Sequence, residues 1–338
     1  MRVKPFLSLL CLSALTLSAQ DLVRLGNLKF AHYGAVSYMK ELGPKYKLKI
    51  EERMFAKGID ISPAIVAGEI DASASALDAA AAGRAAGVPI YVVAGFAKGG
   101  ARMVVGTNSG IKSLKDLKGR KVGVARGGAQ ELLLLAELAQ AGLTWSDKPG
   151  KDVLVMYLPF ADLNQALMAN NIDAMCQSEP YSSQAINRKF GLELMKPYDT
   201  PLGEPIRALV ITEKLYKERR DVARRFLLCF VEATKKFIDD PKFAEKYVRE
   251  VLFKNQYTSE EYQDAIGNSP FCYDITQAHV QITTDLMVQY GVGKMAHPPK
   301  AADWVRLDLL TEAKQQLKID VPKPAAPKPG KAAKAKKG

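Results

Sequence analysis

DISPAIVAGEIDA, residues 60–72, and DLNQALMANNIDA, residues 162–174, align without a gap at an offset of 102. Each copy is typical of a short helix capped by its first Asp, a turn at Gly or Asn, and a strand that opens with Ile. A unit that occurs once in each half predicts two similar α/β lobes. The identical pairs are Asp60/Asp162, Ala64/Ala166, Ala67/Ala169, Ile70/Ile172, Asp71/Asp173 and Ala72/Ala174.

Local features of the two copies support this interpretation. Gln165 follows Asp162 at the spacing of a capping box, and Pro63 falls in the first turn of its helix, where a missing N–H is harmless. Open α/β sheets bind ligands at the carboxyl ends of their strands. Residues 73–75 (SAS) and 177–179 (QSE) are therefore candidate cleft walls. The alternative is that such helix, turn and strand patterns occur in any α/β protein.

The ends of the chain differ from its body. Residues 1–19 combine Arg2 and Lys4 with an apolar run over 6–17 and small residues after it, which predicts a cleavable secretory signal and a periplasmic location. The run is too short to span a bilayer. Residues 321–338 are rich in Lys, Pro and Ala and are expected to be a disordered, solvated tail.

Charge and cysteine content narrow the class of protein. The chain has 338 residues and a net charge of +12, but the first 19 residues carry +2 and the tail +6, which leaves +4 on the body. This balance gives no argument for a nucleic-acid partner. Cys176, Cys229 and Cys272 lie in apolar surroundings and are expected to be buried thiols. If two of them were bridged, Cys229 with Cys272 would be the more plausible pair.

The body alternates expected strands and helices, which predicts βαβ units and a mainly parallel sheet in each lobe. Arg207 opens an apolar run that echoes the one opened by Arg102, so the chain should leave the first lobe near 102–110 and return near 200–212. Two such crossings make a hinge. The expected strands are 23–30, 46–54, 90–96, 102–106, 121–124, 153–158 and 207–212. The expected helices are 36–42, 77–86, 113–119, 130–141, 221–238 and 276–290, with further helices that Pro180 and Pro241 open and Ser259 caps.

The resulting division assigns 20–104 and 205–320 to lobe 1 and 105–204 to lobe 2. Zinc-ligand spacing, a GxSxG elbow, a phosphate-binding Walker loop and a dinucleotide GxGxxG are all missing from the sequence. No metal, cofactor or catalytic residue is therefore predicted.

Several motifs together resemble a known family. SLKDLKGRKVGV (113–124) followed by GGA (127–129), with AGEIDA (67–72) and ANNIDA (169–174), resembles the periplasmic substrate-binding proteins of ABC importers, in the nitrate, sulfonate, taurine and NMT1/THI5-like group. The resemblance covers roughly residues 22–291. It implies a type II periplasmic binding protein fold, in which two doubly wound α/β lobes joined by a two-strand hinge close on a small molecule.

The same resemblance implies a monomer that docks on an ABC transporter permease in the membrane and performs no enzymatic step. The sequence departs from the family in two respects. Ala129 stands where members usually carry Ser or Thr, which puts one hydroxyl contact in doubt, and the cysteine-rich motif of the pyrimidine synthases is missing.

Candidate ligand-binding residues of lobe 1 follow its expected strands. Phe30, His32 and Tyr33 could stack on a ring or wrap an alkyl chain, while His32 or the phenol donates a hydrogen bond. Lys57 precedes Gly58, which allows close approach of the backbone to a ligand. Ser73 and Ser75 are small hydrogen-bond donors in a place where bulk would fill the cleft. The alternatives are a surface histidine, a solvated lysine and serines that merely pack.

Candidates in lobe 2 are Gly127, Gly128 and Ala129, whose amides at a helix N-terminus could hold an anion, and Gln177 and Glu179 beyond the second repeat. Glu179 would prefer an amine or a ring N–H, although it could also be a salt-bridged acid at the rim.

The charges leave the ligand open. Helix termini with Lys57 and Arg126 favour an anion, Glu179 with the aromatic residues favours an amine or heteroaromatic group, and a zwitterion would satisfy both. The predicted function is capture of a small polar solute (sulfonate- or taurine-like, nitrate-like or pyrimidine-like) by hinge closure and its delivery to an ABC permease. The alternatives are a pyrimidine-synthesis enzyme on the same fold, with His32 as a reactive group, and a sensory solute receptor.

Overall fold

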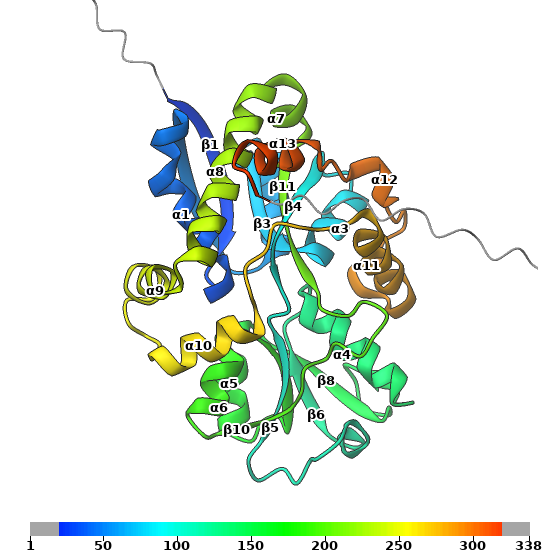
Figure 1. Cartoon of the computed structure of the whole chain (residues 1–338). Coiled ribbons are helices and arrows are strands. Elements are labelled where there is room, and N and C mark those ends of the chain that lie inside the picture. Colours follow the sequence, from blue (N-terminus) through cyan, green and yellow to red (C-terminus); the bar gives the residue numbers. More distant parts are fainter. Residues whose placement is uncertain (1–19, 320–338) are drawn as a thin grey trace, which may run out of the picture.

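Two sheets organise the chain into an upper and a lower lobe (Figure 1), and the α/β class expected from the sequence is confirmed. The computed structural model describes residues 20–319. The expected signal segment (1–19) and tail (321–338) lie outside these residues. We call the upper lobe, which holds the five-stranded sheet, lobe 1 and the lower lobe, which holds the six-stranded sheet, lobe 2.

Lobe 1 is built on strands in the order β2-β1-β3-β11-β4, in which only β11 runs antiparallel to its neighbours. Its strands are β1 (Asp21–Leu28), β2 (Leu48–Phe55), β3 (Ala72–Ala76), β4 (Ile90–Lys98) and β11 (Ile206–Thr212). The helical segments between its first strands are η1 (Ala31–Tyr33), α1 (Gly34–Leu42), η2 (Gly43–Tyr46), η3 (Gly58–Asp60), α2 (Ile61–Val66) and α3 (Leu77–Ala85).

Lobe 2 repeats this plan. Its order β10-β5-β9-β6-β8-β7 matches that of lobe 1 when read as β8-β6-β9-β5-β10, with β5 as the antiparallel strand and β7 as an added edge. The strands are β5 (Ala101–Gly106), β6 (Lys121–Val124), β7 (Trp145–Ser146), β8 (Val153–Tyr157), β9 (Ala174–Ser178) and β10 (Gly191–Met195). The helices are η4 (Leu114–Leu117), α4 (Ala129–Gln140), α5 (Phe160–Met168) and α6 (Tyr181–Asn187).

The repeated segments occupy equivalent places, but their aspartates do not act as expected. Asp60 forms no side-chain hydrogen bond to the helix that follows it, and Asp162 lies inside the first turn of α5, whose N-cap is Pro159. The expected caps and capping box are therefore wrong.

The later aspartate of each repeat holds the neighbouring strand instead. Asp71 accepts hydrogen bonds from the backbone N–H and the guanidinium of Arg24 in β1, at 2.8 to 2.9 Å. Asp173 accepts from the backbone N–H of Lys121 in β6 at 2.8 Å, with Arg120 at 3.4 Å. The identical Asp in both copies thus ties each twin strand to the strand beside it.

The twin strands also begin later than expected. β3 and β9 start at Ala72 and Ala174, two residues after the Ile that was expected to open each strand. Ser73 and Ser75 are therefore buried within β3, and Gln177 is buried within β9, rather than lying in loops beyond the strand ends.

The chain crosses between the sheets at two places. It leaves lobe 1 at Gly99 and Gly100, both with positive φ, and β5 already belongs to the sheet of lobe 2, so the expected boundary at 104 lies too late. A Cβ on Gly99 would lie 2.4 Å from the backbone oxygen of Asn268, which only glycine avoids. The return runs through residues 196–205.

The C-terminal third is helical and packs mainly on lobe 1, where α8 lies against α1 and α13. Helix α10 is different, because it lies at the level between the lobes in Figure 1 and packs on α6 of lobe 2. Thr258, not the expected Ser259, caps α10, in a capping box with Glu261. The elements are α7 (Glu213–Glu218), α8 (Arg220–Asp239), α9 (Pro241–Lys246), the π-helix η5 (Tyr247–Leu252), α10 (Ser259–Asn268), α11 (Gln277–Tyr290), η6 (Val292–Lys294), α12 (Ala301–Trp304) and α13 (Asp308–Gln316).

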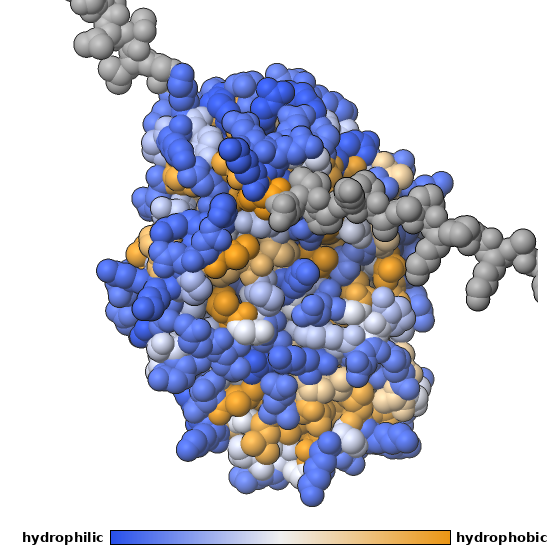
Figure 2. Space-filling model, in the orientation of Figure 1, coloured by the Kyte–Doolittle hydropathy of each residue, from blue (hydrophilic) through white to orange (hydrophobic). Residues whose placement is uncertain are grey.

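Cys176, Cys229 and Cys272 are free and buried, which confirms the prediction of buried thiols. Among residues 20–319, no helix combines the length and apolar character needed to cross a bilayer. On the face drawn in Figure 2, hydrophilic residues cover most of the upper lobe, and hydrophobic residues gather over the lower lobe around β5 and β6.

The roles of the repeated aspartates can be tested by unfolding in urea. Asp71→Ala should lower the free energy of unfolding by about 2 kcal/mol, because it removes three charge-assisted hydrogen bonds, and Asp173→Ala by about 1 kcal/mol. The matched control is the exposed Asp162, where Ala should cost less than about 0.5 kcal/mol. A loss at Asp162 as large as that at Asp71 would restore the capping interpretation.

Candidate functional site

A small cavity lies between the lobes, where the carboxyl ends of the parallel strands of both sheets meet. Its volume is about 20 Å³, which leaves space for roughly one water-sized group. Cavities at the carboxyl edge of α/β sheets are where such folds bind ligands. Lobe 1 contributes Leu28, Phe30, His32, Tyr33, Gly58, Ala76 and Arg207, and lobe 2 contributes Gly127, Gly128, Gln130, Phe160 and Ser178.

Aromatic rings close the cavity from both sides. The ring of Phe30 meets Phe160 edge-on with centroids 5.2 Å apart and meets Tyr181 at 6.0 Å, both across the lobe boundary. Behind this wall, Gln177 Nε2 donates to the backbone oxygen of Phe160 at 2.9 Å. The contacts between lobes show that the cleft is closed, and Gln177 positions the wall without lining the cavity.

Arg207 is the decisive charged group of the site. Its side chain comes from β11 and is only 2% exposed, and its Nη1 has no hydrogen-bond partner among the described residues. Within residues 20–319 no carboxylate lies at ion-pair distance from it. A buried, unpaired charge costs several kcal/mol, so an uncompensated guanidinium in a cavity suits an anionic ligand.

His32 stands beside this charge as a neutral group. It is 1% exposed, and neither ring nitrogen has a hydrogen-bond partner in the described part of the chain. Burial first, and then the positive charge of Arg207, hold the pKa of His32 well below its usual range. The uncharged imidazole can donate one hydrogen bond and accept one.

The glycine-rich loop of lobe 2 is arranged differently from the expectation. Gly127, with φ of +75°, and Gly128 line the cavity, but the Gly127 N–H donates to Glu131 Oε2 at 2.7 Å. A carboxylate of the protein therefore already occupies one of the amides expected to hold an anion. Ala129 lines a smaller adjoining cavity of about 10 Å³.

The structure brings together six of the residues expected to bind the ligand and separates the others. Ser75 is buried with its hydroxyl 3.2 Å from the backbone oxygen of Ala76, and Lys57 is a half-buried residue before η3. The six that line the cavity are Phe30, His32, Tyr33, Gly58, Gly127 and Gly128. The others are Lys57, Ser73, Ser75, Ala129, Gln177 and Glu179.

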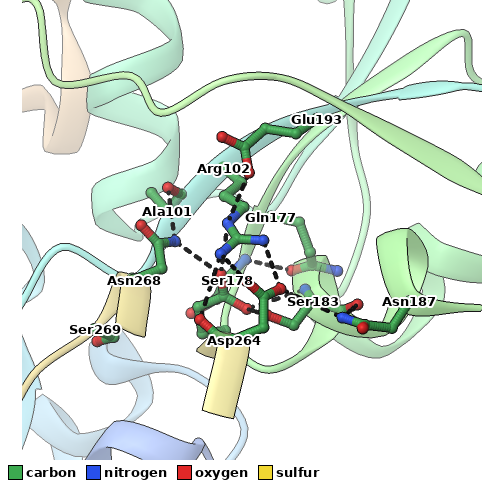
Figure 3. Close-up of polar contacts among 12 residues, drawn as sticks. Ala101, Arg102, Gln177, Ser178, Ser183, Asn187, Glu193, Asp264, Asn268 and Ser269 are labelled. Atoms are coloured by element: carbon green, nitrogen blue, oxygen red, sulfur yellow. Dashed lines mark hydrogen bonds and ion pairs between the residues drawn. The ribbon is translucent and has the colours of Figure 1, made fainter. Parts of the chain in front are cut away.

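Glu179 was expected to face the cleft, and the structure places it in a buried ion cluster around Arg102. Figure 3 shows Arg102 with Glu193 and Asp264, two other members of this cluster. Arg102 Nε lies 3.1 Å from Glu179 and 3.2 Å from Glu193, and Nη1 lies 2.7 Å from Asp264 of α10. The cluster joins β5, β9 and β10 of lobe 2 to α10.

Neutral donors complete the surroundings of Glu179. Ser183 Oγ and Asn268 Nδ2 each donate to its carboxylate at 2.7 Å. Burial raises the pKa of Glu179, whereas Arg102 and these hydrogen bonds oppose the shift. The acid is paired within the protein and does not face the cavity, so its expected role toward the ligand lacks a geometric basis.

Sequence reasoning missed five cavity residues, Leu28, Ala76, Arg207, Gln130 and Phe160, whereas Ser178 lies in the predicted wall 177–179 and lines the cavity. A signal for Arg207 was present, because a charged residue that opens an otherwise apolar strand is buried only when something compensates its charge. Gln130 and Phe160 carried no such signal. Within the part of the chain that the structure describes, no three potential metal ligands come together.

Residues 20–252 match the NMT1-like family along their whole length. The chain belongs to this family. A nitrate/nitrite binding protein, NrtA, of Nostoc sp. is 25% identical over 127 residues, which are 37% of this chain and 28% of that protein. The match thus spans less than a third of that relative's length.

Solved structures of other proteins show the same fold. The periplasmic aliphatic sulphonate binding protein SsuA from Escherichia coli has a TM-score of 0.71 at 22% identity, covering 85% of this chain and 92% of that one. The periplasmic nitrate-binding protein NrtA from Synechocystis PCC 6803 has a TM-score of 0.73 at 18% identity, covering 88% and 89%. The two-lobed periplasmic binding protein fold expected from the sequence is confirmed.

Arg102 and Arg207 are both buried, but only Arg102 is paired with carboxylates. We therefore expect their substitution by Met to change the free energy of unfolding in opposite directions. Arg102→Met should lower the free energy of unfolding by about 3 to 5 kcal/mol, because it leaves buried carboxylates unpaired. Arg207→Met should raise it by about 1 kcal/mol in protein stripped of ligand by unfolding and refolding, because it removes an unpaired buried charge. Equal losses for both variants would mean that Arg207 has a structural partner.

Proposed function

We propose that this chain is the extracytoplasmic solute-binding component of an ABC importer and captures a small anionic solute between its lobes. The observation that carries the proposal is the buried guanidinium of Arg207, which lies in a cavity between the lobes and has no carboxylate partner among the described residues. Neutral His32 adds a hydrogen-bond donor beside it. The solute is bound and released without chemical change.

Two further observations support this function. Both lobes contribute to the cavity, so closure and binding are coupled, as in hinge-closing receptors. The relatives described above are named for binding nitrate, nitrite or aliphatic sulphonates, all of which are anions. We propose further that the chain is exported to the periplasm, acts as a monomer and presents its closed form to a membrane permease.

Two other functions can be distinguished from solute transport by experiment. A pyrimidine-synthesis enzyme would need His32 as a reactive group, and product formation from candidate precursors would establish it. In a sensory receptor, the closed form would bind a receptor kinase instead of a permease. Recovery of the one or the other membrane protein with the liganded chain distinguishes transport from sensing.

The anion-binding function is tested by calorimetry and thermal unfolding with nitrate, ethanesulfonate, 2-aminoethanesulfonate, propanoate and a pyrimidine. A true ligand at 100 times its Kd should stabilise the protein by about 2.7 kcal/mol. Arg207→Gln should weaken its binding about 30-fold or more, because the anion loses its buried charge partner.

Arg224 provides the matched control, since it is half-exposed, already lies 3.1 Å from Glu312 and lines neither cavity at the cleft. Arg224→Gln should change affinity by less than about fivefold. The proposed function fails if no anion stabilises the wild-type protein, or if both variants bind as the wild type does.

A further inference from the structure

A second, larger cavity adjoins the one that holds Arg207. It is a groove of about 370 Å³ between α3 of lobe 1, the start of α4 in lobe 2, and the end of α11. Ile59 and Met287 supply apolar walls, and Gly127 lines both this groove and the inner cavity. A solute larger than a bare anion could therefore occupy both cavities at once.

Asp78 lines this groove and forms no ion pair within residues 20–319. It lies in the first turn of α3 and is 2% exposed, and neither carboxylate oxygen has a hydrogen-bond partner among these residues. Burial raises the pKa of Asp78 to about 6, and Arg207 limits the rise. The backbone N–H groups at residues 78 and 79 also favour the carboxylate, although neither forms a hydrogen bond of good geometry with it. A donor from the groove would therefore still stabilise this buried acid.

Glu131 reaches the same groove from the opposite lobe. It is 5% exposed, and besides the hydrogen bond from Gly127 its negative charge contributes to the raised pKa of Asp78. Closure thus brings two carboxylates from different lobes to one groove. Like charges in a buried site repel strongly unless a cation lies near them.

The protein's own cations fill this role only in part. Arg126 and Lys294 line the groove, but within residues 20–319 neither lies at ion-pair distance from Asp78 or Glu131. The charge of Arg207 favours the carboxylate form of Asp78, but one guanidinium cannot neutralise two carboxylates and an anionic ligand together. With an anion on Arg207, a further positive group in the groove would have to come from the solute.

We infer that the solute carries a protonated amino group, bound by Asp78 with Glu131 in the groove, in addition to the anionic group held by Arg207. This inference rests on the proposed anion-binding function and narrows its ligand class to compounds with both charges. Nitrate and unsubstituted alkanesulfonates, which have no such donor, would leave Asp78 unpaired.

The test uses two pairs of probes that differ only in the amino group, 2-aminoethanesulfonate against ethanesulfonate and 3-aminopropanoate against propanoate. In at least one pair, the amino compound should bind the wild-type protein about tenfold more tightly or better. Asp78→Asn should reduce this ratio toward one, and the unsubstituted anion should bind this variant at least as tightly as the wild type, because a negative charge that acts on Arg207 is removed. Glu131→Gln should reduce it less, and exposed Asp162→Asn should leave it unchanged.

The pH dependence gives an independent measurement. The charged groups that act on Asp78 are Arg207 from β11 and Glu131 from α4, with the neutral phenol of Tyr33 on η1 nearby. Because an ammonium group needs the carboxylate form, the preference for the amino compound should shrink as the pH falls below about 6.

The outcomes separate the two proposals. Binding of anions without any preference for the amino compounds, or a preference that survives Asp78→Asn, overturns this inference and leaves the proposed function standing. Absence of binding by every anion overturns both. Retained affinity of the Asp78→Asn protein for the unsubstituted anion shows that the variant is folded.

Discussion

A buried charge must be compensated, and this constraint acts on two arginines at corresponding places in the lobes. Arg102 and Arg207 are the second residues of β5 and β11, the antiparallel strands that carry the chain between the lobes. They are 3% and 2% exposed. Arg102 is surrounded by three carboxylates and anchors α10 to lobe 2, whereas Arg207 has none within ion-pair distance among residues 20–319. One arginine stabilises the architecture, and the other is left for a ligand.

The different roles follow from a shift of one residue in strand register. Arg207 pairs with Ala76 of β3, and Arg102 pairs with Gln177 of β9. At the repeat offset of 102, the counterpart of Ala76 is Ser178, not Gln177. Because successive side chains point to opposite faces of a sheet, this shift sends the two guanidinium groups to opposite faces. Equivalent strands thus supply one structural charge and one cavity charge.

The sequence was sufficient to predict what depends on local pattern and repetition. The alternating elements, the two lobes and most helix and strand positions follow from periodicity, and the structure agrees within a few residues. The roles of single polar residues did not follow. Asp71 acts through Arg24, which is 47 residues away, and Glu179 acts through Asn268, which is 89 residues away.

The importance of Arg207 and Asp78 lies in partners that they lack, and a missing partner is visible only in three dimensions. A shift of two residues in the start of β3 and β9 was also enough to move Ser73, Ser75 and Gln177 from the expected cleft wall into the sheets. Their side chains then pack within the lobes, because position along a strand decides which face a residue occupies.

Two opposing contributions determine whether this cleft closes. Contacts between the lobes favour closure with or without a ligand, whereas the buried charged and polar groups favour it only when a ligand pairs with them. The aromatic contact of Phe30 with Phe160 and the packing of α10 on α6 favour the closed form in every case. Arg207, Asp78 and His32 oppose it when the cleft is empty, because closure removes water from groups that have no other partner. A ligand shifts such an equilibrium only by its difference in affinity for the two forms. A solute that satisfies the buried charges therefore gains most of its binding energy on closure, whereas one that leaves a charge unpaired favours closure less. The unsatisfied groups make the closed form selective, since the receptor is stably closed only around a solute of matching charge.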